Sequence, residues 1–185
     1  MQKRKSTSIL TLIVVLILAI YYMIQSRNQT STPPTPHPPT NGSTPTLGLR
    51  TKTSGCVSTN ALPDPGCTPG AVFSDATVAK ICTPGYSSQV RNVPSSEKDQ
   101  VYAEYGITSH ATGQYEVDHL ISLELGGSND IANLWPEPAD PRPGFHEKDK
   151  VENYLHAQVC SGKMSLQEAQ YQIAANWMAI YQTLP

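Results

Sequence analysis

A long stretch with almost no large apolar side chains, residues 25–53, limits where this chain can build a folded core. It is dominated by Ser, Thr, Pro, Asn and Gly, as in TSTPPTPHPPTNGSTPT. Such a composition buries too little apolar surface to offset the entropy that a chain loses on folding, so we expect a disordered, partly polyproline II stalk. The core must then come from residues 54–185, a length that suits one domain.

The segment before the stalk predicts a membrane anchor. Residues 8–24, SILTLIVVLILAIYYMI, carry no charge and follow a basic tip, residues 1–7, that contains KRK. The run is about the minimum that spans a bilayer, and the basic tip predicts a cytoplasmic N-terminus. A cleaved signal peptide is the alternative, although LAIYY offers no small-x-small cleavage site. We therefore expect a single-pass cell-membrane protein with its C-terminal domain outside the cytoplasm, or a secreted protein if the anchor is cleaved.

The predicted domain is acidic. From Ser54 onward it has 7 Lys and Arg against 15 Asp and Glu, a net charge of -8, whereas the whole chain has -2. This charge argues against tight non-specific binding of a polyanion, because such binding comes mostly from Lys and Arg that neutralise phosphates. A nucleic-acid enzyme with this composition would depend on a metal and a few local cations.

Four cysteines lie in the predicted domain, and none forms a Cys-x-x-Cys pair of the kind that clamps zinc. An even number in an exported domain indicates two disulfides, and sequence alone allows three pairings. We favour Cys56–Cys67, which would close a small Pro/Gly-rich loop. The second bond, Cys82–Cys160, would then join the start of the domain to the end of a late helix.

The pattern of apolar residues predicts a mixed α+β domain. Helices are expected over residues 95–105, 147–159 and 165–180, the last opening with a capping box at Ser165. Between the first two helices, residues 115–121 and 131–135 indicate two short strands joined by a Gly-Gly turn. A Pro-rich loop, residues 136–144, leads from the second strand into the helix. The order is strand, turn, strand, helix.

Polar residues interrupt this apolar stretch at intervals: an Asp-His pair, Asp118 and His119, then Asn133, then His146. Neighbours on a strand point to opposite faces, so the pair could share one site only where the strand ends or bulges. Such local exceptions are frequent at functional sites. An acid and histidines can supply the base and the metal ligands that phosphodiester hydrolysis needs.

The ordered set D-H, G-G, N-L-W, H and K-D-K resembles the HNH endonucleases, also called His-Me finger or ββα-metal nucleases. Its flanks, CTPGYSSQVRNVPSSEKDQVYAEYG and VCSGKMSLQEAQYQIAANW, look like those of small exported bacterial members, so the resemblance covers about residues 67–181. It implies a ββα-metal core with flanking helices. It also implies an enzyme that hydrolyses DNA, with DNA as its partner besides the membrane; the sequence indicates no protein partner.

The same resemblance assigns roles to the residues. His119 would be the general base, Asp118 and His146 would hold one divalent metal, and Asn133 would tie the hairpin and orient the base. Hard oxygen ligands favour magnesium, with manganese or zinc as alternatives. Phosphate contacts are expected from three cations of the loop and helix: Arg142, Lys148 and Lys150.

Two features keep alternatives open. The Pro-rich loop before His146 makes the alignment of the last His uncertain, so Asn129 or Asn133 is an alternative second metal ligand. The acidic charge of the domain leaves open a catalytically inactive HNH-like module that binds at the cell surface. It also leaves open a structural surface protein in which the stalk is the working part and the disulfide-linked domain is a cap.

Overall fold

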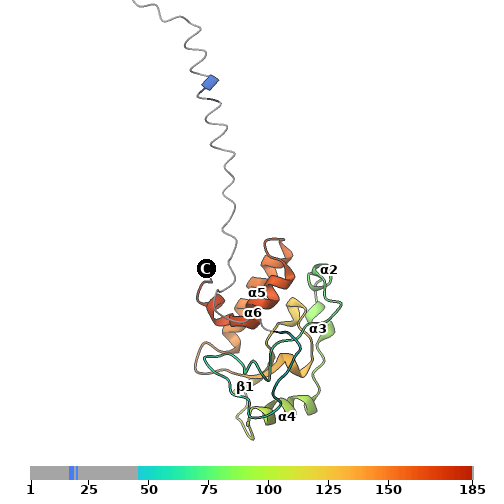
Figure 1. The fold of residues 1–185 in the computed structure, drawn as a ribbon, viewed down its shortest axis with the longest axis vertical. Coiled ribbons are helices and arrows are strands. Elements are labelled where there is room, and N and C mark those ends of the chain that lie inside the picture. The colour runs from blue at the N-terminus through green and yellow to red at the C-terminus, as the bar shows by residue number, and fades with distance from the viewer. Residues whose placement is uncertain (1–16, 19, 21–45, 185) are drawn as a thin grey trace, which may run out of the picture. The chain divides into compact units, whose positions relative to one another are not determined.

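The computed structural model describes residues 17, 18, 20 and 46–184 (Figure 1). The chain divides into two units, Met1–Thr40 and Asn41–Pro185. The first unit is described only at its three helical residues, so the predicted anchor and most of the predicted stalk lie outside the described residues. Among the residues that are described, no helix has both the length and the apolar character to cross a membrane.

Helices and one small sheet make up the second unit, which confirms the α+β class. Three helices come first: α2 (Val78–Ile81), α3 (Tyr86–Val90) and α4 (Ser95–Glu104). Strands β1 (Tyr115–His119) and β2 (Leu134–Pro138) form an antiparallel pair, and two 3₁₀ turns, η1 (Leu123–Leu125) and η2 (Ile131–Asn133), lie in the loop between them. The chain ends with α5 (Phe145–Cys160) and α6 (Leu166–Tyr181).

The hairpin differs from the prediction at its second strand. Residues 131–133 form the turn η2, and β2 starts at Leu134 and continues through Pro136 to Pro138. Proline is tolerated there because every strand of a two-stranded sheet has a free edge, so the missing N–H need not face a neighbour. The residues expected to form a strand instead bring the Asn133 side chain into the loop.

The main core lies between the last two helices and the loop of the hairpin. Helices α5 and α6 pack side by side (Figure 1), and their apolar faces bury Val151 and Leu155 with Ile173 and Trp177. Both helices begin and end close to their predicted limits, and the Ser165 hydroxyl accepts a hydrogen bond from the Glu168 N–H, as a cap should. A smaller cluster covers the other face of the hairpin, where α4 packs.

Two disulfides cross-link the unit, Cys56–Cys67 and Cys82–Cys160, which is the pairing that the sequence favours. Their Cα atoms are 6.0 and 5.7 Å apart, within the usual range for a disulfide. The second bond closes a segment of 78 residues and joins α2 to the end of α5. Disulfides persist in oxidising compartments, so the domain belongs outside the cytoplasm.

The folded unit begins earlier than residue 54, where the sequence places the end of the stalk. Leu47 packs against the main core, and the N–H groups of Thr51 and Lys52 both donate to the Gly66 carbonyl. The Arg50 guanidinium forms an ion pair with Glu104 of α4. Composition alone missed this segment because backbone hydrogen bonds and one ion pair, rather than large apolar side chains, hold most of it.

Candidate functional site

The two faces of the hairpin separate Asp118 from His119. The strands pair residue for residue, with Asp118 opposite Trp135 and His119 opposite Leu134. Opposed residues share a face of an antiparallel pair, and successive residues alternate between faces. Asp118 therefore lies on the face that packs against α5, whereas His119 lies with Val117 on the face covered by α4. The strand has no bulge that could turn both side chains to one side.

Asn133 ties the loop of the hairpin together, as the resemblance implies. Its side chain is fully buried, and its Oδ1 accepts from the N–H groups of Ile121 (2.9 Å) and Ala71 (3.3 Å). Its Nδ2 donates to the carbonyls of Ile121 and Ser128. The amide thus fills both its donor and its acceptor positions with backbone groups. Glycine is needed at position 127 for this packing, because a Cβ there would lie 1.7 Å from the Ile121 carbonyl oxygen.

A second amide, Asn129, fixes the ring of His119. Asn129 Nδ2 donates to the Val90 carbonyl at 2.8 Å, and its Oδ1 accepts from the Asn92 N–H at 3.2 Å. These two backbone contacts determine which end of the amide is oxygen, so His119 Nε2, 3.1 Å from Oδ1, must carry the proton and donate it. The other ring nitrogen, Nδ1, is then the proton acceptor, and no hydrogen bond occupies it within residues 46–184.

His119 is held neutral. Only 2% of the residue is exposed, and burial lowers the pKa of His119 to about 4. Asp118 and the hydrogen bond to Asn129 act in the opposite direction, while the positive charges of Arg91 and Lys148 add to the lowering. At pH 7 the imidazole is therefore uncharged and able to accept a proton.

Arg91 is a cation that the sequence analysis overlooked. It is exposed and stands between Val90 and Asn92, the two residues whose backbone groups hold Asn129. Its charge is close enough to lower the pKa of His119, and it opposes the burial that raises the pKa of Glu116 and Asp149. The sequence gives little signal for it, because QVRNVP carries no motif and Arg91 lies 27 residues before the Asp-His pair.

On the other face of the hairpin, Lys148 of α5 occupies the surroundings of Asp118. Its ammonium is fully buried and donates to Asp118 Oδ2 and to the His119 carbonyl, each at 2.7 Å, and to the Glu152 carboxylate. These three acceptors use all three donors of the ammonium. A fourth group, Glu137, is buried 4.0 Å from Nζ, and neither of its carboxylate oxygens has a hydrogen-bond partner among the described residues.

The three carboxyl groups that surround Lys148, those of Asp118, Glu137 and Glu152, differ in their pKa shifts. Burial alone would raise the pKa of Asp118, but the Lys148 ammonium outweighs burial and lowers it. The surrounding carboxylates likewise outweigh the burial of Lys148 and raise its pKa. Burial raises the pKa of Glu137 well above its ordinary value, and it raises the pKa of Glu152 to about 7. Asp118 and Lys148 are therefore the charged pair, and burial favours the protonated form of Glu137 beside them.

His146, expected to bind a metal with Asp118, is not brought to it. His146 is exposed, and its ring contacts the Phe145 ring at a tilt of 58°, with ring centroids 4.3 Å apart. It comes two residues before Lys148, and two residues turn an α-helix by roughly 200°, so the two side chains leave α5 in nearly opposite directions. Because Lys148 is the one that points at Asp118, the Asp118–His146 pair does not form, and the two residues do not fit a shared metal ion.

The expected phosphate contacts are also rearranged. Lys148 cannot reach a phosphate because its side chain is 0% exposed. Arg142 and Lys150 are exposed, but both lie near Glu147 at the start of α5, at 3.6 and 3.9 Å. Lys150 also lies over the Tyr181 ring, 5.9 Å from its centroid. The amphipathic pattern of α5 predicts that Lys148 faces solvent, because such a pattern takes no account of charges that pair in the interior.

A different group of metal-ligand types occurs at the other end of α5. Cys82, His156 and Cys160 place one ligand atom each within 4.8 Å of one another. The two cysteines are joined in a disulfide, so their sulfurs are not the thiolates that bind zinc. His156 Nε2 lies 3.0 Å from the Ile81 carbonyl, which gives this ring a structural partner.

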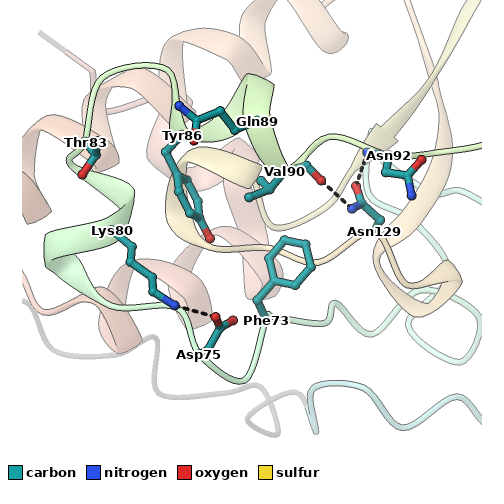
Figure 2. A pocket seen from close by; sticks show the side chains of 9 residues that line it. All are labelled: Phe73, Asp75, Lys80, Thr83, Tyr86, Gln89, Val90, Asn92 and Asn129. Carbon is teal, nitrogen blue, oxygen red and sulfur yellow. Dashed lines mark hydrogen bonds and ion pairs between the residues drawn. The ribbon is translucent and has the colours of Figure 1, made fainter.

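A shallow pocket of about 590 Å³ adjoins the His119 face and shares Asn129 with it (Figure 2). Sequence reasoning did not find it, because its walls come from segments that are far apart in the chain. The lining residues are Phe73, Asp75, Lys80, Thr83, Tyr86, Gln89, Val90, Asn92 and Asn129.

No protein-family model matches this chain, and no curated protein or solved structure shows significant similarity to it.

Proposed function

We propose that the domain is an HNH-type, ββα-metal endonuclease that hydrolyses phosphodiester bonds of DNA, with His119 as its general base. The observation that carries the proposal is the state of the His119 ring. It is neutral, its Nε2–H is fixed on Asn129, and its Nδ1 is the acceptor. This ring sits at the end of a strand in an order of strand, loop, strand and helix, with Asn133 tying the loop, as the family resemblance implies.

In this reaction Nδ1 of His119 removes a proton from a water molecule while the water oxygen forms a bond to phosphorus. The bond from phosphorus to the leaving oxygen breaks, and that oxygen takes a proton from solvent. The imidazolium that forms is stabilised by the Asn129 oxygen and by the nearby Asp118 carboxylate, the two groups that raise the pKa of His119. A base positioned in this way contributes about 10²–10⁴-fold to the rate.

Arg91 is the cation placed to meet the phosphate. It is exposed, its neighbours hold Asn129, and its charge reaches His119. An arginine can form two parallel hydrogen bonds to phosphate oxygens, which positions the phosphate as well as neutralising it. In an acidic domain one such local cation has more influence than it would on a basic surface.

The divalent metal that the resemblance implies is not used in these steps, because Asp118 is bound by Lys148 and His146 leaves the helix on another side. Lys148 instead supplies a fixed positive charge beside Asp118 and holds the His119 carbonyl.

The test is cleavage of supercoiled plasmid by the full chain, purified in detergent, in magnesium and again in EDTA. We expect nicked and then linear plasmid from the wild type and no cleavage above background from His119→Ala. The matched control is His110→Ala, which changes an exposed histidine in the loop before β1. Cleavage that is unchanged in His119→Ala would overturn the proposal.

A binding or structural module is the competing function, and the net charge of -8 from Ser54 onward favours it. It predicts that the wild type leaves plasmid intact at all metal concentrations. Both functions fit an exported domain carried on a stalk and a signal anchor, residues 8–24, which we include in the proposal. Cell fractionation with protease added outside the cell tests that placement, since the domain should be degraded while a cytoplasmic marker survives.

A further inference from the structure

The pocket beside His119 has walls of two kinds. Phe73 and Tyr86 contribute aromatic rings that are both half-buried, and Val90 adds apolar surface between them (Figure 2). The side chains of Gln89 and Asn92 are exposed at the rim and make no hydrogen bond within residues 46–184. Aromatic walls with amide groups free at the edge suit a flat, polar-edged ring better than an aliphatic or a purely ionic ligand.

Charge also argues against a phosphate as the main occupant of the pocket. Its one ammonium, Lys80, already forms an ion pair with Asp75 (Figure 2). That pairing cancels the charge of Lys80 and lowers the pKa of Asp75, so the carboxylate stays ionised. An anion entering here would be repelled by the Asp75 carboxylate as well as attracted by the Lys80 ammonium. An uncharged ring would not be repelled.

Asn129 connects this pocket to the proposed catalytic residue. The same Oδ1 atom accepts from the Asn92 N–H on the pocket side and from His119 Nε2 on the other. A ligand in the pocket is therefore separated from His119 by the width of one side chain. Arg91, which is exposed, comes between the pocket residues Val90 and Asn92 in the chain and is not itself one of the lining residues.

We propose that this pocket binds a single unpaired nucleobase, stacked against Tyr86 and Phe73, of the strand whose neighbouring phosphate lies at His119. The inference rests on the proposed nuclease function and adds a substrate class to it, namely single-stranded or locally unpaired DNA. A base inside a duplex is stacked on both sides and cannot enter a pocket, whereas an unpaired base stacks readily on aromatic side chains. The rim amides of Gln89 and Asn92 would meet the edge of the base.

The experiment measures binding without cleavage. His119→Gln keeps an amide that can donate to Asn129 Oδ1 but removes the base, so it serves as the background in the full chain. Fluorescence anisotropy with fluorescein-labelled decathymidylate gives the affinity for a single strand. A labelled dA·dT hairpin, whose ten-base-pair stem is closed by a hexaethylene glycol linker so that no base is unpaired, gives the affinity for a duplex. Tyr86→Ala is expected to weaken binding of the single strand about tenfold and to leave hairpin binding unchanged, because stacking on one aromatic ring is lost.

Two further variants separate stacking from folding. Tyr86→Phe keeps the ring and should restore single-strand affinity to within about twofold. Tyr154→Ala removes an exposed tyrosine of α5 that lines a different hollow, and it should change neither affinity. Equal affinity for the single strand and the hairpin, or no loss in Tyr86→Ala, would overturn the inference.

Failure of this inference and failure of the proposed function give different results. Plasmid cleavage that depends on His119, together with binding that does not depend on Tyr86, overturns the base pocket and leaves the nuclease standing. Tyr86-dependent binding of decathymidylate without any cleavage by the wild type supports the pocket and overturns the nuclease.

Discussion

Asp118 and His119 are neighbours on one strand, and they lie in opposite electrostatic surroundings. On the Asp118 face, a buried ammonium meets three carboxyl groups, and the pKa shifts there keep an ion pair charged in the interior. On the His119 face, an amide and backbone groups surround the ring, and burial keeps it neutral. In the first arrangement the Lys148 ammonium has all three of its donors paired, whereas the second keeps one acceptor nitrogen free within the described residues and adjoins a pocket.

This difference indicates that the two residues do different work. A buried ion pair is costly to assemble, and removing one partner leaves a buried charge without compensation. The Asp118 face is therefore a structural device that holds α5 against the hairpin. The neutral imidazole contributes little to packing between elements, since the hydrogen bond to Asn129 is the only one that its ring makes within the described residues. Mutations on the two faces should accordingly separate stability from activity.

The largest expected effect is on activity, from His119→Gln. We expect the rate of plasmid cleavage to fall by up to about 10⁴-fold, or roughly 5 kcal/mol of transition-state stabilisation, because the proton acceptor is lost. The free energy of unfolding at pH 7 should change by less than about 1 kcal/mol, since glutamine can keep the bond to Asn129. Single-turnover cleavage rates and urea unfolding measure the two quantities. A large loss of stability with little loss of rate would reverse the roles given to the two faces.

Lys148→Met should produce the reverse pattern. Methionine fills a similar volume but leaves the partly buried carboxylates of Asp118 and Glu152 without their cation, which we expect to lower the free energy of unfolding by about 3 kcal/mol. Adding Asp118→Asn to Lys148→Met removes one of the stranded charges and should recover part of the loss, so the two changes should not be additive. Urea unfolding of both single variants and the double variant forms the cycle. Additive losses would show that the ion pair contributes no coupling.

The two faces should also differ in how pH changes stability. The unfolded His119 binds a proton near pH 6.5, whereas the folded residue does so only near pH 4, so acid favours unfolding between these values. The contribution is fully present above pH 6.5 and is lost as the pH falls to 4, at most about 3 kcal/mol. Subtracting the unfolding free energies of His119→Gln from those of the wild type across this range isolates it. A difference that stays flat from pH 6.5 to 4 would mean that the folded histidine titrates normally.

Glu137, on the other face, should change the stability in the opposite direction as the pH rises. Its pKa is raised by burial, so the folded state keeps a proton that the unfolded state releases above about pH 4.5. The stability that Glu137 contributes is present below about pH 4.5 and is lost as the pH rises toward the pKa of Glu137 in the folded state. Glu137→Gln, a neutral replacement of the same shape, should therefore lose less stability than the wild type between pH 5 and 8. Thermal unfolding at a series of pH values gives the comparison.

Much of the fold could be predicted from the sequence because its signals are local. The spacing of apolar residues in α5 and α6 determines which faces are buried. Gly162 marks the end of α5, and Ser165 marks the start of α6. The order of strand, loop, strand and helix also follows from local pattern. The disulfide pairing agrees with a simple argument from loop length.

The candidate site was only partly predictable, because its decisive contacts are between distant residues. Asn129 meets Val90 and Asn92 across almost forty positions, and nothing local in either segment indicates the contact. Lys148 reads as a solvent-exposed lysine by periodicity, since only the fold shows that three acceptors surround its ammonium. His119 and Asn133 were recognisable from the motif, whereas Arg91 and the pocket were not.

The smallest expected effect comes from His146→Ala, and it tests the comparison most directly. If His146 were a metal ligand beside Asp118, the enzyme would lose a large part of its activity in His146→Ala. In the structure His146 is exposed, contacts the Phe145 ring and leaves α5 away from Lys148, so we expect the cleavage rate to stay within about twofold of wild type. The free energy of unfolding should change by less than about 0.5 kcal/mol, as for other surface positions. Cleavage rates in a magnesium titration of His146→Ala and wild type measure this. A shift of the magnesium midpoint in the variant would show that His146 binds the ion during catalysis, and the Asp118 face would then have to open and release Lys148.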